Sequence, residues 1–182
     1  MQQKVLVAAG NSVGMFYTAP EGTSLPSYPG ETPGASWQLV GDVGEDGLTL
    51  TLPSGEVIRN WALQPKRKIN TEPGSLAVPI LDTTKKVMET LFGADNVSYL
   101  AATATHGNVS KVKLSPDVSA KPAAYLFLIK DGDTLCMVGT ESGLITSIDD
   151  VPLKGTEATI WNAAIQGDWT FEHDDGQIAS GS

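Results

Sequence analysis

Tyr125-Leu-Phe-Leu-Ile-Lys130 and Thr134-Leu-Cys-Met-Val-Gly-Thr140 are two apolar stretches that only Asp131-Gly132-Asp133 separates. Both stretches are rich in residue types that favour β-strands. Asp-Gly is among the strongest signals for the tight turn of a β-hairpin. The sequence therefore predicts an antiparallel hairpin over residues 125–140 and a mainly β fold around it.

The composition of the whole chain favours the same fold class. Charged residues make up 18% of the 182 residues, below the roughly 25% of an average globular protein. The 19 Gly and 11 Pro residues favour turns over long helices. Further stretches with strand-like composition lie at 36–43, 48–52, 57–63, 97–103, 109–114, 144–148 and 156–164.

The stretch 36–43 alternates in a way that indicates a half-buried strand. The alternation is expected to place Trp37, Leu39 and Val43 on one side of the strand and Val40 on the other. Such a strand has one face on the core and one face toward water.

The regular repeat Leu-Thr-Leu-Thr-Leu at 48–52 predicts another strand, which Pro53-Ser54-Gly55 ends. Residues 57–63 follow as its expected hairpin partner, so this region forms a hairpin or a long flap. Residues 64–80 contain Pro73-Gly74 and Pro79, which argue against a continuous central strand. We expect a broken or edge strand there.

One helix is predicted, over residues 83–92, with Asp82 as its N-cap and Gly93 at its C-terminal end. Its apolar residues Val87, Met88, Leu91 and Phe92 fall on one stripe, which is expected to pack on the sheet. Lys85, Lys86, Glu89 and Thr90 are expected to face away.

The length suits one domain. We expect an N-terminal arm and extended connector over residues 1–35, a β-rich domain over 36–172, and a flexible C-terminal tail over 173–182, with Trp169 and Phe171 pairing before the tail. Cys136 is the only cysteine, which excludes an intramolecular disulfide and suggests a buried residue. The apolar segment 5–9 is too short for a signal-peptide core or a membrane span, so folding in the cytosol is expected.

Charge and motifs exclude several kinds of function. A net charge of −9 disfavours a conventional DNA-binding module, and Lys66-Arg67-Lys68 is interpreted as a solvated loop. The two histidines, His106 and His173, lie in turn-like or polar surroundings that do not suggest a catalytic base. Zinc-ligand spacing, an EF-hand loop and a phosphate-binding glycine motif are all missing from the sequence, so no cofactor or metal site is expected.

Several segments, in the same order along the chain, resemble the tail tube proteins of siphophages, the long-tailed phages with non-contractile tails. The likeness covers most of residues 14–165, and one departure is the pair Pro73-Gly74 with Pro79, where the family usually has an uninterrupted strand. The segments that carry it are GMFYTAPEGT at 14–23, LVGDVGEDG at 39–47, residues 57–61, LFGADNV at 91–97, residues 125–132 and residues 144–164.

The resemblance implies a β-sandwich or half-barrel with one flanking helix, which assembles as hexameric rings stacked into a tube. Such a protein is a structural part of the virion that conducts DNA during ejection and catalyses nothing. Its expected partners are further copies of itself, the tape measure, tail tip and tail terminator proteins, and genomic DNA that passes through the lumen, but no membrane. Synthesis and assembly are expected in the cytoplasm of the bacterial host.

The resemblance also places the contact between rings in a flap at about residues 44–58. The residues expected there are Glu45, Asp46, Glu56 and Arg59.

Two other classes of function stay open. A carbohydrate-binding or adhesive β-sandwich would use exposed tryptophans and acidic turns, and the candidates are Trp37, Trp61, Trp161 and Trp169. A hydrolase would use a pair of carboxylates, and the sequence recommends no particular pair.

Overall fold

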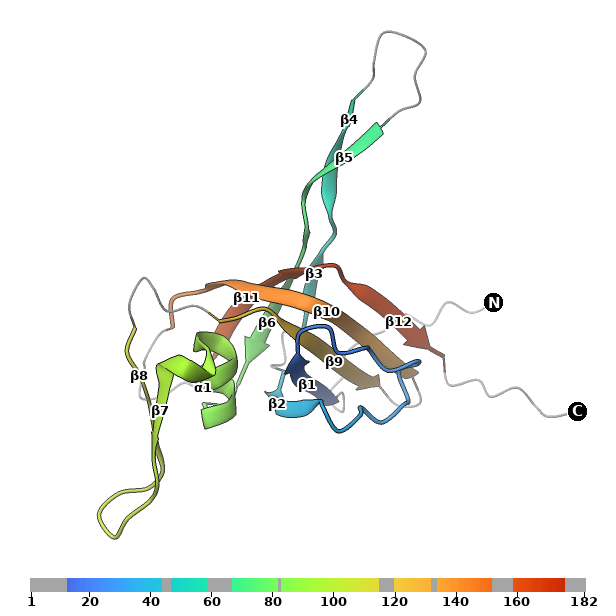
Figure 1. The fold of residues 1–182 in the computed structure, drawn as a ribbon. Coiled ribbons are helices and arrows are strands. Elements are labelled where there is room, and N and C mark those ends of the chain that lie inside the picture. Colours follow the sequence, from blue (N-terminus) through green and yellow to red (C-terminus); the bar gives the residue numbers. More distant parts are fainter. Residues whose placement is uncertain are drawn as a thin grey trace, which may run out of the picture.

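The computed structural model of the chain describes residues 13–43, 47–58, 67–81, 83–114, 120–131, 134–151 and 159–175. Most of these residues form antiparallel strands beside one α-helix, so the prediction of a mainly β fold is confirmed. Figure 1 shows a curved sheet with the helix against it and two narrow hairpins that extend away from this body.

The hairpin predicted over residues 125–140 lies at the centre of the sheet. It consists of β9 (Ala123–Asp131) and β10 (Thr134–Ile148), which pair from Asp131 and Thr134 onward. β10 runs through both of the strands predicted at 134–140 and 144–148, with an irregularity between Thr140 and Gly143. A Cβ atom at Gly143 would lie 2.9 Å from side-chain atoms of Thr140 and Tyr125, so the bend requires glycine.

One sheet contains most of the strands. Val43, which follows β2, and Ile80 in β6 form an isolated bridge between two parts that are far apart in the strand order. The sheet therefore curls toward closure, as in the half-barrel form of the predicted fold. The order is β2 (Gln38–Asp42), β1 (Val13–Pro20), β9, β10, β11 (Trp161–Gly167), β6 (Gly74–Ile80) and β3 (Thr49–Thr51), with β12 (Thr170–Asp174) paired to the first part of β10.

Residues 13–20, which were expected to belong to an N-terminal arm, form strand β1 of the main sheet. The strand lies between β2 and β9, and Phe16 in it has no exposed surface. The Phe16 ring stacks on the Phe127 ring with 4.5 Å between centroids. Residues 13–20 are apolar enough to enter the sheet, whereas the Pro- and Gly-rich residues 21–37, here named the connector, contain no strand.

The main core lies between the inner face of the sheet and α1 (Lys85–Phe92). The four residues of the predicted apolar stripe are all buried. Thr90 is buried as well, which corrects the expectation that it faces away. Its hydroxyl donates a hydrogen bond to the backbone oxygen of Lys86 at 2.8 Å, and this bond satisfies the hydroxyl inside the protein.

The helix begins at Lys85, so its N-cap is Thr84 and not the predicted Asp82, which lies outside the described residues. The backbone N–H of Val87 donates to the hydroxyl oxygen of Thr84 at 3.3 Å. The predicted end at Gly93 is confirmed: its φ of 83° suits glycine, and its N–H donates to the backbone oxygen of Glu89 at 2.9 Å.

The alternation predicted for 36–43 is wrong because β2 contains a bulge. Phe16 pairs with Gly41 and Tyr17 with Leu39, so Val40 is an extra residue without a partner position in β1. Val40 therefore packs in the main core, and Leu39 is 53% exposed. A bulge reverses the sides of the residues after it, which regular alternation does not predict.

The predicted hairpin between 48–52 and 57–63 is also wrong. β3 pairs with β6, and the chain continues past Pro53 into β4 (Ser54–Ile58), which pairs with β5 (Arg67–Glu72). Pro53 and Pro73 lie opposite each other, between the β3–β6 pairing and the β4–β5 pairing. They interrupt the ladder there without reversing the chain. β3 with β4 and β5 with β6 form the two arms of one long hairpin. Its far part, β4–β5, extends away from the body (Figure 1).

β6 lies between β11 and β3, so it is not the edge strand expected within 64–80. The expected break occurs at Pro73, whereas Pro79 lies inside the strand. Proline is tolerated there because the pairing of β3 ends opposite Ala77.

The strands expected at 97–103 and 109–114 are present in shorter form, whereas β11 only overlaps the end of the strand expected at 156–164 and continues to Gly167. β7 (Val97–Leu100) and β8 (Val109–Val112) form a second hairpin near α1, after the short 3₁₀ turn η1 (Ala94–Asn96). β12 contains Phe171 and extends to Asp174, two residues into the expected C-terminal tail. Residues 176–182 of that tail lie outside the described residues.

Candidate functional site

The outer face of the sheet has two halves that differ in composition. Over β1, β9 and the first part of β10 the outward side chains are apolar, and the connector lies against them. Trp37 of the connector packs with Leu126 and Met137, both of which have no exposed surface. We name this surface the covered half.

Over β3, β6, β11 and the second part of β10, residues 143–148, the outward side chains other than Pro79 are exposed or half-buried. The register places Ser75, Gln166 and Leu144 in one row across the sheet, and pairing sets neighbouring rows beside it. No residue of these four described segments is charged. We name this surface the bare half; it consists of Thr49, Thr51, Ser75, Ala77, Leu144, Thr146, Ser147, Asn162, Ala164 and Gln166.

Exposed carboxylates stand at both ends of the bare half. Glu141 and Asp168 lie at the end where β11 stops, and Asp149 and Asp150 follow β10 at the other end. The bare half is therefore a neutral surface with acidic ends.

Several strand edges are open among the described residues. β12 pairs there only with β10, and β3 pairs only with β6. Phe171 on β12 is 59% exposed, and Leu52, directly after β3, is 72% exposed. An open edge with apolar side chains is a template for pairing with another chain.

The β4–β5 hairpin contains one of the residues predicted for a contact between subunits. Glu56 lies in β4 opposite Ile69 of β5. Glu45, Asp46 and Arg59 lie outside the described residues, so the structure does not test whether the four residues lie together. Residues 44–58 are also not a single flap, because β3 within them belongs to the main sheet.

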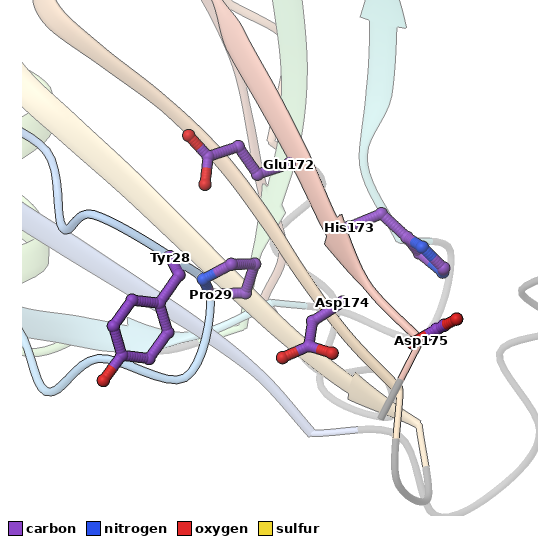
Figure 2. Close-up of a pocket in the computed structure, with 6 residues that line it drawn as sticks. All are labelled: Tyr28, Pro29, Glu172, His173, Asp174 and Asp175. Atoms are coloured by element: carbon purple, nitrogen blue, oxygen red, sulfur yellow. The ribbon is translucent and has the colours of Figure 1, made fainter. Parts of the chain in front are cut away.

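A shallow groove of about 480 Å³ lies where the connector meets β12. Figure 2 shows Glu172 and Asp174 on the side of Tyr28 and Pro29, with His173 on the other side of the strand. The groove is open and has no deep apolar part, unlike the usual site for a small molecule.

The catalytic and metal-binding roles that the sequence analysis weighed and did not favour gain no support from the geometry of the described residues. His106 lies in the loop between β7 and β8, where its Nδ1 atom is 2.7 Å from the backbone oxygen of Gly107, and His173 is exposed. Within the described ranges no group of three or more His, Cys, Asp or Glu side chains is placed to hold a metal ion. Cys136 is buried, as predicted. This burial raises the pKa of its thiol, which makes the thiol a poor nucleophile.

No helix among the described residues is long and apolar enough to span a membrane.

The described tryptophans pack inside the protein. Trp37 is 8% exposed, and Trp161 meets Phe92 edge to face and donates its indole N–H to the Thr83 hydroxyl at 3.3 Å. Trp169 is half-buried near Phe127. Trp61 lies outside the described residues. None of the three described rings forms the flat exposed platform that sugar stacking needs.

The bare half was not predicted, although the sequence contains a signal for it. In 74–80 and 161–167 apolar core residues alternate with Ser, Ala, Asn and Gln, and Lys, Arg, Asp and Glu are absent. Recognising a surface from this signal requires the pairing of four segments that are distant in sequence.

The chain was compared with known proteins. A family model described as phage tail tube protein matches residues 2–161. No curated protein matches the chain. The matched region contains β1 to β10, the helix and both projecting hairpins, and it ends at the first residue of β11. The chain therefore belongs to the phage tail tube protein family.

Proposed function

We propose that this chain is the major tail tube subunit of a siphophage, and that it assembles as hexameric rings stacked into the conduit for DNA ejection. Members of the family are structural proteins of the phage tail, so the chain is a component of the virion. The finer proposal concerns the number of subunits, the stacking and the non-contractile tail.

The observation that carries the proposal is the set of open strand edges on one curled sheet. The edges of β3 and β12 are different surfaces, so contact between neighbouring copies would be head to tail. A head-to-tail contact that closes on itself makes a ring. Pairing in the ring also removes the aggregation hazard that exposed edges create.

The β4–β5 hairpin extends away from the body (Figure 1), where another ring could contact it. We propose that Glu45, Asp46, Glu56 and Arg59 contribute to this contact. Both signs of charge are present among these four residues, so neighbouring hairpins or ring faces can form ion pairs.

The net charge of −9 suits a conduit for DNA. A basic bore would hold DNA through many phosphate contacts, whereas a bore without excess cations lets it slide. The proposed partners are further copies of the chain, the tape measure, tail tip and tail terminator proteins, and DNA passing without sequence recognition. Synthesis and assembly would take place in the host cytoplasm, and the protein would not act as an enzyme.

The test is negative-stain electron microscopy of the concentrated protein, with light scattering to count subunits. Hollow rings or long tubes with six-fold end views are the expected result. A protein that stays monomeric even when seeded with phage tail-tip complexes would overturn the proposal.

The contact between rings has its own test in charge reversal. Glu56→Lys is expected to leave rings intact and to shorten or abolish tubes, because it sets a second cation close to Arg59 in the sequence. Lys111→Glu on β8 is the matched control, because it reverses one charge on the other projecting hairpin. Normal tubes from Glu56→Lys would remove Glu56 from the contact and leave the tube itself standing.

A further inference from the structure

The bare half of the sheet has a composition that ordinary protein surfaces do not share. Surfaces of soluble domains are roughly 25–35% Lys, Arg, Glu and Asp. The four strand segments of the bare half contain none of these residues, although the chain as a whole contains 33 of them, 12 basic and 21 acidic. A whole sheet face without charge calls for a physical reason.

Contact with another subunit is a poor explanation for this face. The centres of protein interfaces are enriched in aromatic residues, Met and Arg. The bare half has none of these residues, and Leu144, which is 39% exposed, is its only large apolar side chain. The other large exposed apolar side chains of the described residues lie outside it, at Tyr28, Leu39, Leu52, Leu81, Tyr99, Leu100, Leu114 and Phe171.

The hydroxyl and amide groups of the bare half suit a surface that stays hydrated. Thr49, Thr51 and Gln166 present groups that bind water and carry no charge. Such a surface has no cation with which to form a lasting contact to phosphate. The carboxylates at its two ends, among them Glu141 and Asp149, repel a polyanion and keep it away from the protein.

We infer that the bare half lines the bore of the tube and faces double-stranded DNA, which it neither binds nor strongly repels. The inference rests on the proposed tube and adds which face of the subunit points inward. It commits to a neutral bore wall with acidic margins, made by β3, β6, β11 and the second part of β10.

The test is the accessibility of an introduced cysteine in assembled tubes. Gln166→Cys places a thiol in the row of the bare half that contains Ser75 and Leu144. The native Cys136 is only 2% exposed, so the wild-type chain measures the background. Two maleimide reagents are used: a small biotin maleimide, and a maleimide on a gold particle too large to enter the tube. Lys111→Cys on the exposed side of β8 is the comparison position.

In dissolved subunits both reagents are expected to label both cysteines. In tubes the small reagent is expected to label Gln166→Cys still, because the bore contains water, while labelling by the particle is lost. Asn162→Cys and Thr51→Cys repeat the measurement at neighbouring strands, so poor assembly of one variant does not decide the outcome.

The other outcomes separate the two proposals. Labelling of Gln166→Cys tubes by both reagents would place the bare half on the outside, and labelling by neither would bury it between subunits. Either result overturns the inference while the tube stands. Wild-type protein that forms no tubes overturns the proposed function itself, and the inference with it.

Discussion

The covered half and the bare half belong to the same face of the same sheet and share β10, yet their outward side chains differ in burial. In the covered half Leu126 and Met137 are shielded by the connector, and each such burial contributes about 1.5–3 kcal/mol. In the bare half the equivalent positions are Gln166 and Leu144, which are exposed, and Ser75, which is half-buried. The first surface stabilises the subunit, and the second contributes little to folding.

This difference teaches that an exposed sheet face can be distinguished from a core face by what it lacks. Both halves alternate with the inner core, so periodicity alone does not separate them. The outward residues separate them, since the covered half has mainly Ala, Leu and Met, whereas the bare half has mainly Thr, Ser, Asn and Gln with two Ala and one Leu.

The largest expected effect comes from removing the centre of the covered half. Trp37→Ala is expected to lower the free energy of unfolding by about 3–5 kcal/mol, because it leaves a cavity between the connector and the sheet. Urea denaturation measures the change, with Gln166→Ala as the control on the bare half. Equal losses from the two variants would contradict the division of the face.

Tyr125 provides a test of the alternation along β9. Its side chain lies in the main core, whereas its sequence neighbours Ala124 and Leu126 belong to the covered half on the other face of the sheet. Burial raises the pKa of Tyr125 to about 12. The unfolded chain releases this proton near pH 10, so stability that is complete below about pH 10 is lost as the pH rises toward about 12, by up to about 3 kcal/mol.

The measurement compares urea unfolding of the wild-type protein and Tyr125→Phe at about pH 9 and about pH 11.5. The variant lacks the ionising phenol, so its loss of stability between the two values is expected to be smaller. The same loss in both proteins would show that other groups cause the pH dependence.

A smaller effect is expected where the connector crosses β10. A Cβ atom at Gly139 would lie 2.5 Å from Cδ2 of Leu25, so Gly139→Ala must displace the connector side chain. We expect a loss of about 1–3 kcal/mol from this overpacking. Gly34→Ala is the control, since no atom lies within 4 Å of a Cβ built there. Hydrogen exchange at 124–128 would report whether the connector has loosened.

The smallest effect on stability is expected in the bare half, together with a gain of binding. Gln166→Lys is expected to change the free energy of unfolding by less than about 0.5 kcal/mol, as for an ordinary surface position. Tubes of this variant are expected to retain short duplex DNA at low salt and to release it as salt rises. Tubes that bind no more DNA than the wild type would argue against a bore position for this residue.

The sequence predicted the elements that depend on neighbouring residues. The hairpin of residues 125–140 was predicted correctly because Asp131-Gly132 and two apolar runs are local signals. The helix and its end at Gly93 were predicted for the same reason, although its start was displaced because Thr84 and Asp82 are both good N-caps.

The errors concern features that depend on distant partners. The bulge at Val40 is defined by pairing with β1. The chain continues straight past Pro53 because β3 pairs with β6 and β4 pairs with β5, and both partners lie further along the chain. The central place of β1 follows from its pairing with β9 and from the fit of Phe16 on Phe127. Local alternation contains no information on any of these contacts.

The pairing of β1 with β9 also sets an order of events in time. The Thr18 hydroxyl donates a hydrogen bond to the backbone oxygen of Ala124, across 106 residues of sequence. Strands joined over such a distance form late, after most of the chain has left the ribosome. β12, with its open edge, is the last strand in the described part of the sequence. An incomplete chain therefore lacks this edge, and the edge becomes available for pairing with another copy only once the sheet that supports it has been made.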